Sequence, residues 1–336
     1  MKVAILGAGA IGAYVGAALH RGGTEVHLVA RGPHLQAIRA DGVQVLSPRG
    51  DWVARTPATD DPAEIGPVDV VFLGLKANSY ASCGPLIEPL LHDKTAVVAA
   101  QNGIPWWYFH GLPGPYEGRR IESVDPGGEV TRVLSLDRAI GCVVYCSTEL
   151  EGPGVVRHLE GTRFSIGEPG GGRSDRCLEF SEAMIAGGLK CPVEEDIRND
   201  IWIKLLGNAA FNPISALARA TMVEIAQHRG TRAMIRLMME ETLEIAAAVG
   251  STPDISVDKR IDGAERVGEH KTSMLQDLEK DKPLELDVIL AAVVELADLT
   301  HTKAPTLRAV HAVTDLLSTK VGTTPIAHAP TAARAV

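Results

Sequence analysis

A stretch near the middle of the chain, "DIWIKLLGNAAFNP" at 200–213, carries three polar side chains on an otherwise apolar background. Lys204, Asn208 and Asn212 recur every fourth residue, so a helix places all three on one face. Burying an ammonium group and two amides costs free energy unless each group finds a partner. Burial also lowers the pKa of a lysine, which makes it a better proton donor. The spacing therefore raises the question of which groups lie opposite this face of the helix.

The proline after the stripe constrains the helix that carries it. Pro213 lacks a backbone donor and disfavours helical geometry at Asn212, so we expect the helix to kink or end there and Asn212 to line a cleft. The alternative is a structural role, in which Lys204 extends to water and the asparagines cap the kink. The stripe by itself supports both interpretations.

The composition is that of an ordinary globular protein. The chain has 336 residues, enough for two domains, with 45% apolar and 22% charged residues. Its net charge of −9 argues against a nucleic-acid or anionic-membrane surface. We expect no membrane span, because no segment offers about twenty uncharged apolar residues. The five cysteines lack the spacing of a metal site, and we expect buried thiols in a cytoplasmic protein.

The first residues have the pattern of a dinucleotide-binding turn. An apolar strand at 2–6 is followed by glycines in G-x-G-x-x-G spacing, a helical period to His20 and a second strand at 24–31. In such a turn the glycines allow a tight bend, a close approach to a pyrophosphate and close helix–strand packing. The same run could imitate a signal peptide, but its glycines count against that. The predicted cofactor turn comprises Gly7, Ala8, Gly9, Ala10, Ile11 and Gly12.

The end of the second strand indicates which cofactor binds. Sites for NAD place an acidic residue there, about twenty residues after the motif, to bind the ribose 2′-hydroxyl. Here the sequence reads "VARG" and offers Arg31 instead. An arginine suits a 2′-phosphate, so NADP(H) is the predicted cofactor. The alternative is that Arg31 is merely solvated at the start of a loop.

Two further polar residues follow predicted strands. The runs 68–76 and 95–103 read as buried parallel strands, with a helix at 77–91 between them. Lys76 and Asn102 lie at the carboxyl ends of these strands, where ligands bind in doubly wound sheets. A lysine at such a position can also be simply solvated.

The second half of the chain changes character. Short strands over 139–167 are expected to extend the sheet in antiparallel fashion, and a helix follows at 175–188. Strand signals then stop, and helical periods cover 198–250, 265–280, 284–300 and 304–318. We predict an α/β protein in which a doubly wound Rossmann-type sheet precedes an all-α domain. The predicted boundaries are 1–195, 196–322 and a frayed tail at 323–336.

Taken together, these motifs resemble the ketopantoate reductases, also called 2-dehydropantoate 2-reductases. The similarity runs over nearly the whole chain: "GAGAIG" at the N-terminus, "LGLKA" around Lys76, "QNG" around Asn102, "DIRNDIWIKLLGNAAFNP", and "SMLQDLEKDKPLELD" from Ser273. The resemblance implies a Rossmann domain and a helical domain that reduce a 2-keto acid with NADPH in the cleft between them.

The resemblance also implies roles for individual residues. Lys204 is the general acid, and Asn208, Asn212 and Ser273 bind the substrate. Asn102 contacts cofactor and substrate, Lys76 lies near the nicotinamide, and Glu285 meets the ribose side of the cofactor. From the residues alone, Ser273 also fits a helix N-cap, and Glu285 also fits the first turn of a helix. No metal site is implied.

The chain departs from the family pattern after Asn102. Residues 104–138 are longer and more aromatic than the connection expected there. Of the four Trp, five Tyr and five Phe in the chain, five cluster here: Trp106, Trp107, Tyr108, Phe109 and Tyr116. They could form a lid over the substrate. They could equally form a cluster that packs the insertion against the helical domain or a second subunit.

This departure leaves the substrate open. Ketopantoate, reduced to (R)-pantoate, is the default prediction, and a different, possibly bulkier 2-keto acid is the alternative. Opine, hydroxyacid or glycerol-phosphate dehydrogenases are neighbouring possibilities, and a non-catalytic NADP(H) sensor is one from another class. We expect a monomer or a homodimer formed through long amphipathic helices such as 222–249, with no nucleic-acid partner.

Overall fold

The computed structural model describes residues 1–321, so the predicted tail at 323–336 lies outside the described residues. A mixed nine-stranded sheet has the order β4-β3-β9-β8-β7-β6-β1-β2-β5. The strands are β1 (Lys2–Leu6), β2 (Glu25–Val29), β3 (Val43–Leu46), β4 (Trp52–Ala54), β5 (Ala58–Thr59), β6 (Val70–Leu73), β7 (Ala96–Ala100), β8 (Ala139–Gly152) and β9 (Val155–Gly167).

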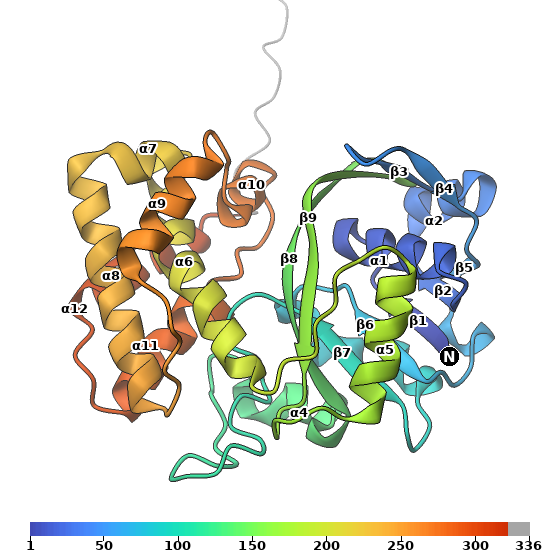
Figure 1. Cartoon of the computed structure of the whole chain (residues 1–336), viewed down its shortest axis with the longest axis horizontal. Coiled ribbons are helices and arrows are strands. Elements are labelled where there is room, and N and C mark those ends of the chain that lie inside the picture. Colours follow the sequence, from blue (N-terminus) through green and yellow to red (C-terminus); the bar gives the residue numbers. More distant parts are fainter. Residues whose placement is uncertain (322–336) are drawn as a thin grey trace, which may run out of the picture.

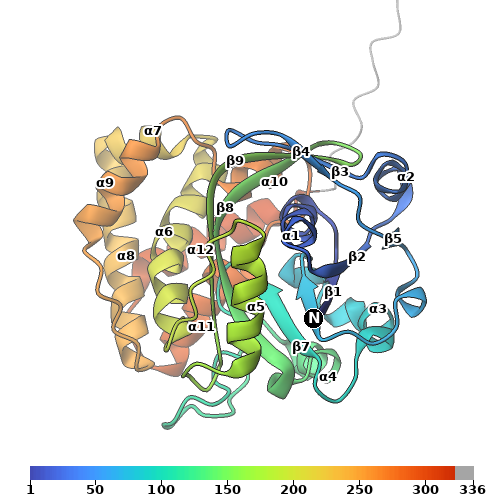
Figure 2. The same ribbon diagram turned by 45° about the vertical axis from the view of Figure 1, so that its right-hand side comes forward.

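The helices fall into two sets. Those that accompany the sheet are α1 (Ala10–Arg21), α2 (Gly32–Asp41), α3 (Gly84–Ile87), α4 (Glu129–Val133) and α5 (Asp175–Ala186). Those that follow it are α6 (Ile197–Ala218), α7 (Met222–Gln227), α8 (Arg229–Ala248), α9 (Val257–Val267), α10 (Ser273–Glu279), α11 (Ala292–Leu299) and α12 (Pro305–Ser318). The second set gathers on one side of the molecule, with β8 and β9 facing it (Figures 1 and 2). The predicted fold class is confirmed, while the boundary near 196 stays a prediction.

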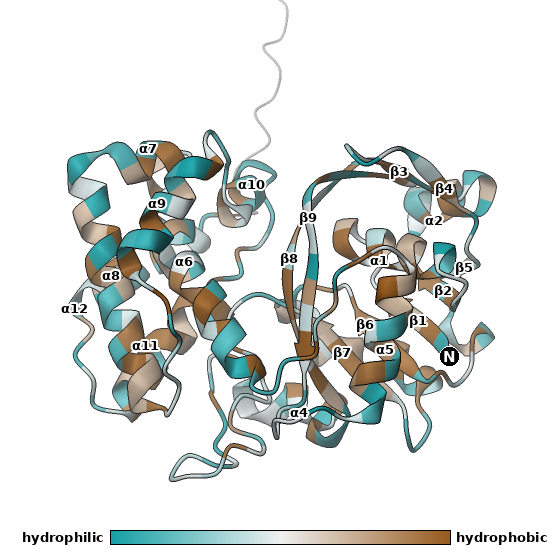
Figure 3. Ribbon diagram, viewed as in Figure 1, coloured by the Kyte–Doolittle hydropathy of each residue, from teal (hydrophilic) through white to brown (hydrophobic). Residues whose placement is uncertain are grey.

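The central strands are apolar on both faces. In β1, Ala4 and Leu6 belong to one buried cluster, whereas Val3 and Ile5 belong to another on the opposite face. The first cluster continues into the helical half, so the sheet and the helices share a core. Figure 3 shows the apolar residues along these strands and on parts of the helices. Burial on both faces explains why these strands read as continuous hydrophobic runs.

Two predicted elements differ in detail. The helix expected at 77–91 is a series of 3₁₀ turns around the short α3, because Pro85 and Pro89 interrupt its backbone hydrogen bonds. The region 139–167 forms two long strands rather than several short ones. The pairing of β8 with β7 is parallel, and the pairing of β8 with β9 is antiparallel. The antiparallel extension that was expected therefore begins only with β9.

The helix of the polar stripe does not end at its proline. Helix α6 contains Pro213 and continues to Ala218. Phe211 and Ile214, on either side of the proline, are buried in the shared core. This burial offsets the cost of a proline inside a helix, about 3 kcal/mol. No helix within residues 1–321 is both long and apolar enough to cross a bilayer.

Candidate active site

The glycine turn between β1 and α1 needs its glycines for two separate reasons. Gly7 has φ of +95°, a left-handed conformation that side chains disfavour. A Cβ atom at Gly12 would lie 2.1 Å from the carbonyl oxygen of Gly7, so this position must stay bare. Gly9 differs, because the nearest atom to a Cβ there is the oxygen of Gly74 at 3.9 Å. The backbone at Gly9 is therefore open at the N-terminus of α1, the position at which dinucleotide-binding turns receive a pyrophosphate.

Arg31 lies just after the carboxyl end of β2. It follows β2 by two residues and is the N-cap residue of α2, with an exposed side chain. Within residues 1–321, no hydrogen bond or ion pair engages its guanidinium group. The residues present at this edge of the sheet therefore suit a phosphorylated ribose.

Lys204, the first residue of the stripe on α6, contacts β8 and the turn after β7. The ammonium group of Lys204 donates hydrogen bonds to Oδ1 of Asn102, at 2.8 Å, and to the carbonyl oxygen of Val144, at 2.5 Å. It also lies 5.8 Å from the centre of the Tyr145 ring. Burial lowers the pKa of Lys204 from 10.5 to about 8, against the smaller opposing effects of Cys142 and Glu285. The group is thus poised to donate a proton near neutral pH.

Asn102 connects Lys204 to Glu285. While its Oδ1 accepts from Lys204, its Nδ2 donates to Oε2 of Glu285 at 3.3 Å. The other oxygen of Glu285 accepts from the backbone of Ala77 at 3.5 Å. Glu285 precedes the π-helical segment Asp287–Ala291 and is not in a first helical turn. Through these bonds, the segments that follow β6 and β7 are connected both to α6 and to the segment that precedes Asp287–Ala291. Such π-helical segments are common at functional sites.

The other predicted substrate residues are less uniform. Asn208 is half-buried one turn after Lys204, and no described residue bonds to its amide. Asn212 is buried, and its Nδ2 has no partner among the described residues. Ser273 is the exposed first residue of α10, where Thr272, not Ser273, is the N-cap. The two amides thus keep free hydrogen-bonding capacity for a ligand.

Lys76 makes a contact that the sequence did not reveal. Its ammonium group forms an ion pair with Asp277 of α10, which connects the turn after β6 to the helical half. Asp277 lies inside the motif that begins at Ser273, but its type and spacing alone gave it no role. The contact between Lys204 and the carbonyl oxygen of Val144 could not be predicted from the sequence either, because every residue has a carbonyl group and only the fold brings this one to Lys204.

Comparisons with known proteins show the family to which the chain belongs. The family model "Ketopantoate reductase PanE/ApbA" matches residues 3–106, and "Ketopantoate reductase PanE/ApbA C terminal" matches residues 196–318. A 2-dehydropantoate 2-reductase from Mesorhizobium japonicum is 48% identical over 96% of this chain and 99% of that protein. The chain belongs to the ketopantoate reductase family. It is therefore an oxidoreductase.

Solved structures extend the comparison to the fold. The 2-dehydropantoate 2-reductase from Geobacter metallireducens superposes with a TM-score of 0.83 at 28% identity, covering 94% of this chain and 100% of that chain. A D-mandelate dehydrogenase with NADH and anilino(oxo)acetate gives a TM-score of 0.80 at 22% identity, covering 96% and 99%. The second likeness shows the fold alone.

The aromatic residues of this ketopantoate reductase family member form a packing cluster. Trp106, Trp107, Tyr108 and Phe109 are buried in the core shared with the helical half. The hydroxyl of Tyr108 accepts a bond of 2.7 Å from Nε1 of Trp202 on α6. Arg198, also on α6, donates to the carbonyl of Tyr108 at 2.8 Å. The lid interpretation is therefore wrong for Trp106–Phe109, which fasten the insertion to α6.

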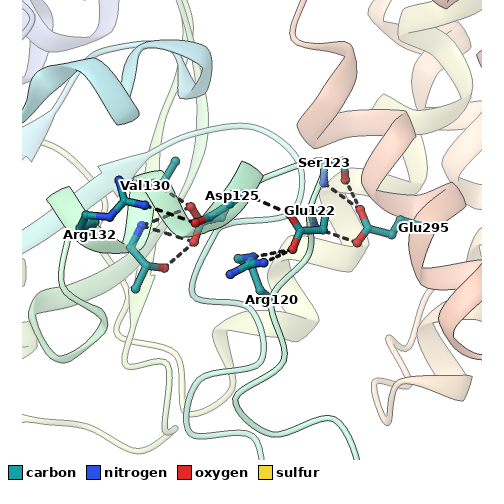
Figure 4. Close-up of polar contacts among 9 residues, drawn as sticks. Arg120, Glu122, Ser123, Asp125, Val130, Arg132 and Glu295 are labelled. Atoms are coloured by element: carbon teal, nitrogen blue, oxygen red, sulfur yellow. Dashed lines mark hydrogen bonds and ion pairs between the residues drawn. The ribbon is translucent and has the colours of Figure 1, made fainter.

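The later part of the insertion contacts α11 and borders a pocket. Glu295 of α11 accepts hydrogen bonds from the backbones of Glu122 and Ser123, at 2.7 and 2.8 Å, and Asp125 accepts one from Val130 (Figure 4). The pocket they adjoin is lined by Ala77, Asn78, Ala81, Ser123, Val124, Pro126, Glu129, Val130, Leu284, Glu285, Asp287 and Val288. The insertion thus shapes the cleft beside Glu285, although its aromatic residues do not.

Titration of Lys204 gives folding a measurable pH dependence. Its pKa is 10.5 in the unfolded chain and about 8 in the folded protein, so the unfolded chain binds more protons between these values and stability rises with pH there. Below pH 8 the buried charge costs about 1–3 kcal/mol, less than the full change in pKa implies because the side chain keeps some exposure. We expect Lys204→Met to raise the unfolding free energy at pH 7 by this amount, measured in urea. The gain should vanish by pH 10.5 and be absent in the exposed control Lys190→Met; a gain that is constant with pH would contradict the lowered pKa.

Proposed function

We propose that the protein reduces a 2-keto acid to a 2-hydroxy acid with NADPH, with ketopantoate as the first substrate to test. The observation that carries this proposal is the buried ammonium group of Lys204, held by Asn102 at the end of β7 with its pKa lowered to about 8. The names of the relatives support the same reaction, since the Mesorhizobium and Geobacter proteins are called 2-dehydropantoate 2-reductases.

The residues divide the work of such a reduction. When bound, the nicotinamide cofactor supplies the hydride for the ketone carbon. Lys204 stabilises the charge that develops on the ketone oxygen and delivers the proton that completes the hydroxyl group. Asn102 holds the ammonium group in place, while the free amides of Asn208 and Asn212 orient the substrate. Ser273, at the start of α10, is proposed as a further substrate contact, and Glu285 as the contact on the ribose side of the cofactor.

An absorbance assay tests the proposal. NADPH oxidation is followed with a panel of 2-keto acids of increasing size, ketopantoate first. Turnover of at least one acid is expected, and the size of the preferred acid distinguishes ketopantoate from a bulkier substrate. Tight NADPH binding without turnover of any acid would instead favour the non-catalytic sensor.

Self-association through 222–249 stays a prediction. Met234 and Leu237 on α8 are exposed apolar side chains in this segment.

The proposed cofactor preference rests on Arg31. Arg31→Ala removes a cation that can pair with a 2′-phosphate, so affinity for NADPH should fall about 10–100-fold while affinity for NADH stays the same. Fluorescence titration of both nucleotides measures the ratio. Arg173→Ala, another exposed arginine without a described partner, is the matched control and should change neither affinity. An unchanged NADPH-to-NADH ratio in Arg31→Ala would remove this contact.

A further inference from the structure

A second cation lies against the polar stripe of α6. Arg260 is on α9, and its guanidinium group rests on the backbone of Gly207 in α6. A Cβ atom at Gly207 would lie 2.1 Å from Nη2 of Arg260 and 2.7 Å from both its Cζ and Nε. A glycine inside a helix costs about 1 kcal/mol relative to alanine. Here it provides the space in which the guanidinium group sits.

The position of Gly207 places Arg260 beside the reacting groups. Gly207 follows Lys204 by three residues, so the two are neighbours on the helix surface, whereas the adjacent Asn208 points about 100° away from Gly207. Arg260 also interacts electrostatically with Lys204 and with Tyr145, the ring near the ammonium group. Two cations from different helices therefore converge on one side of α6.

Arg260 has no protein partner within residues 1–321. Its Nε is buried without a hydrogen bond, and no described carboxylate forms an ion pair with its guanidinium group. The carboxylate near Tyr145, Asp200, is already bonded to Arg163 and to the Tyr145 hydroxyl. A buried charge without a counterion is costly, and a guanidinium group stays charged in proteins. Arg260 is half-buried, so an anion bound here would supply the counterion that the described residues do not.

We propose that Arg260 binds the carboxylate group of the substrate. This inference rests on the proposed function and adds a substrate-binding residue to it. Lys204 then donates a proton to the ketone oxygen, and Arg260 binds the adjacent carboxylate. The planar guanidinium group can meet two carboxylate oxygens at once, which fixes the orientation of the flat keto acid. Arg260 is thereby the residue that selects 2-keto acids over neutral ketones.

The test compares a 2-keto acid with its methyl ester, which keeps the ketone but lacks the charge. Arg260→Gln should lower kcat/KM for the acid about 100-fold and leave kcat/KM for the ester within about twofold. Arg260→Lys should recover part of the loss. The control Arg266→Gln, an exposed arginine on the same helix, should change neither substrate. An equal loss for acid and ester in Arg260→Gln, or no loss, would overturn the proposal.

Binding of oxamate gives a readout that does not need turnover. Oxamate carries a carboxylate beside a carbonyl, and it should raise the melting temperature of the wild type in the presence of NADP⁺ but not that of Arg260→Gln. If the wild type reduces no keto acid yet shows this difference, the proposed function fails and the carboxylate site stands. A wild type that neither reduces a keto acid nor binds oxamate contradicts both.

Discussion

Lys204→Ala is expected to lower the rate of 2-keto acid reduction by about 10²–10⁴-fold while leaving the affinity for NADPH within about twofold. The loss follows from the position of the ammonium group, which is held by Asn102 and the Val144 carbonyl and has a pKa of about 8. Without it, charge develops on the ketone oxygen with no proton donor beside it. NADPH binding survives because the glycine turn and Arg31 lie in other elements.

Steady-state rates and fluorescence titration separate these two quantities. Lys190→Ala, which removes an exposed lysine outside the site, serves as the control and should keep the wild-type rate. Small primary amines added to Lys204→Ala should restore part of the rate, since they can enter the space left by the side chain. Equal rates for the wild type and Lys204→Ala would remove this residue from the mechanism.

Gly9→Ala is expected to weaken NADPH binding about 10–100-fold without changing the free energy of unfolding by more than about 0.5 kcal/mol. The ligand-free protein has room for the added methyl group, whose nearest neighbour would be the Gly74 oxygen at 3.9 Å. Its φ of −69° is also ordinary for alanine. The methyl group occupies the space in which a pyrophosphate approaches the backbone.

Gly12→Ala provides the matched comparison, because its methyl group meets the protein itself. The added Cβ would lie 2.1 Å from the Gly7 oxygen, so the turn must shift and the unfolding free energy should fall by about 1–3 kcal/mol. Urea unfolding and NADPH titration measured on both variants distinguish the two effects. Full affinity in Gly9→Ala would place the phosphates elsewhere.

Much of the fold and of the candidate site could be predicted from residues that lie close together in the sequence. A few neighbouring residues are enough to predict the glycine turn, the strands at 2–6 and 95–103, and the stripe on α6, whose polar residues recur every fourth position. The sequence is less informative where packing between distant elements decides the outcome. Of the two outcomes expected at Pro213, a kink or an end of the helix, the end was wrong: α6 continues to Ala218, with Phe211 and Ile214 buried in the shared core. The turns at 77–91 have a local cause instead, because Pro85 and Pro89 lack the backbone donors that a continuous helix needs.

The sequence by itself determined which groups are available: a lysine with two amides on one helical face, a bare glycine turn and an arginine in place of an acid at the end of the second strand. Only the tertiary structure decided which partners those groups have. It brings Asn102 and Glu285 to Lys204 from segments about a hundred and eighty residues apart, and sets Arg260 on Gly207. The reason is physical. Covalent spacing fixes the face of a helix, but burial and the absence of counterions arise only when separate elements pack together.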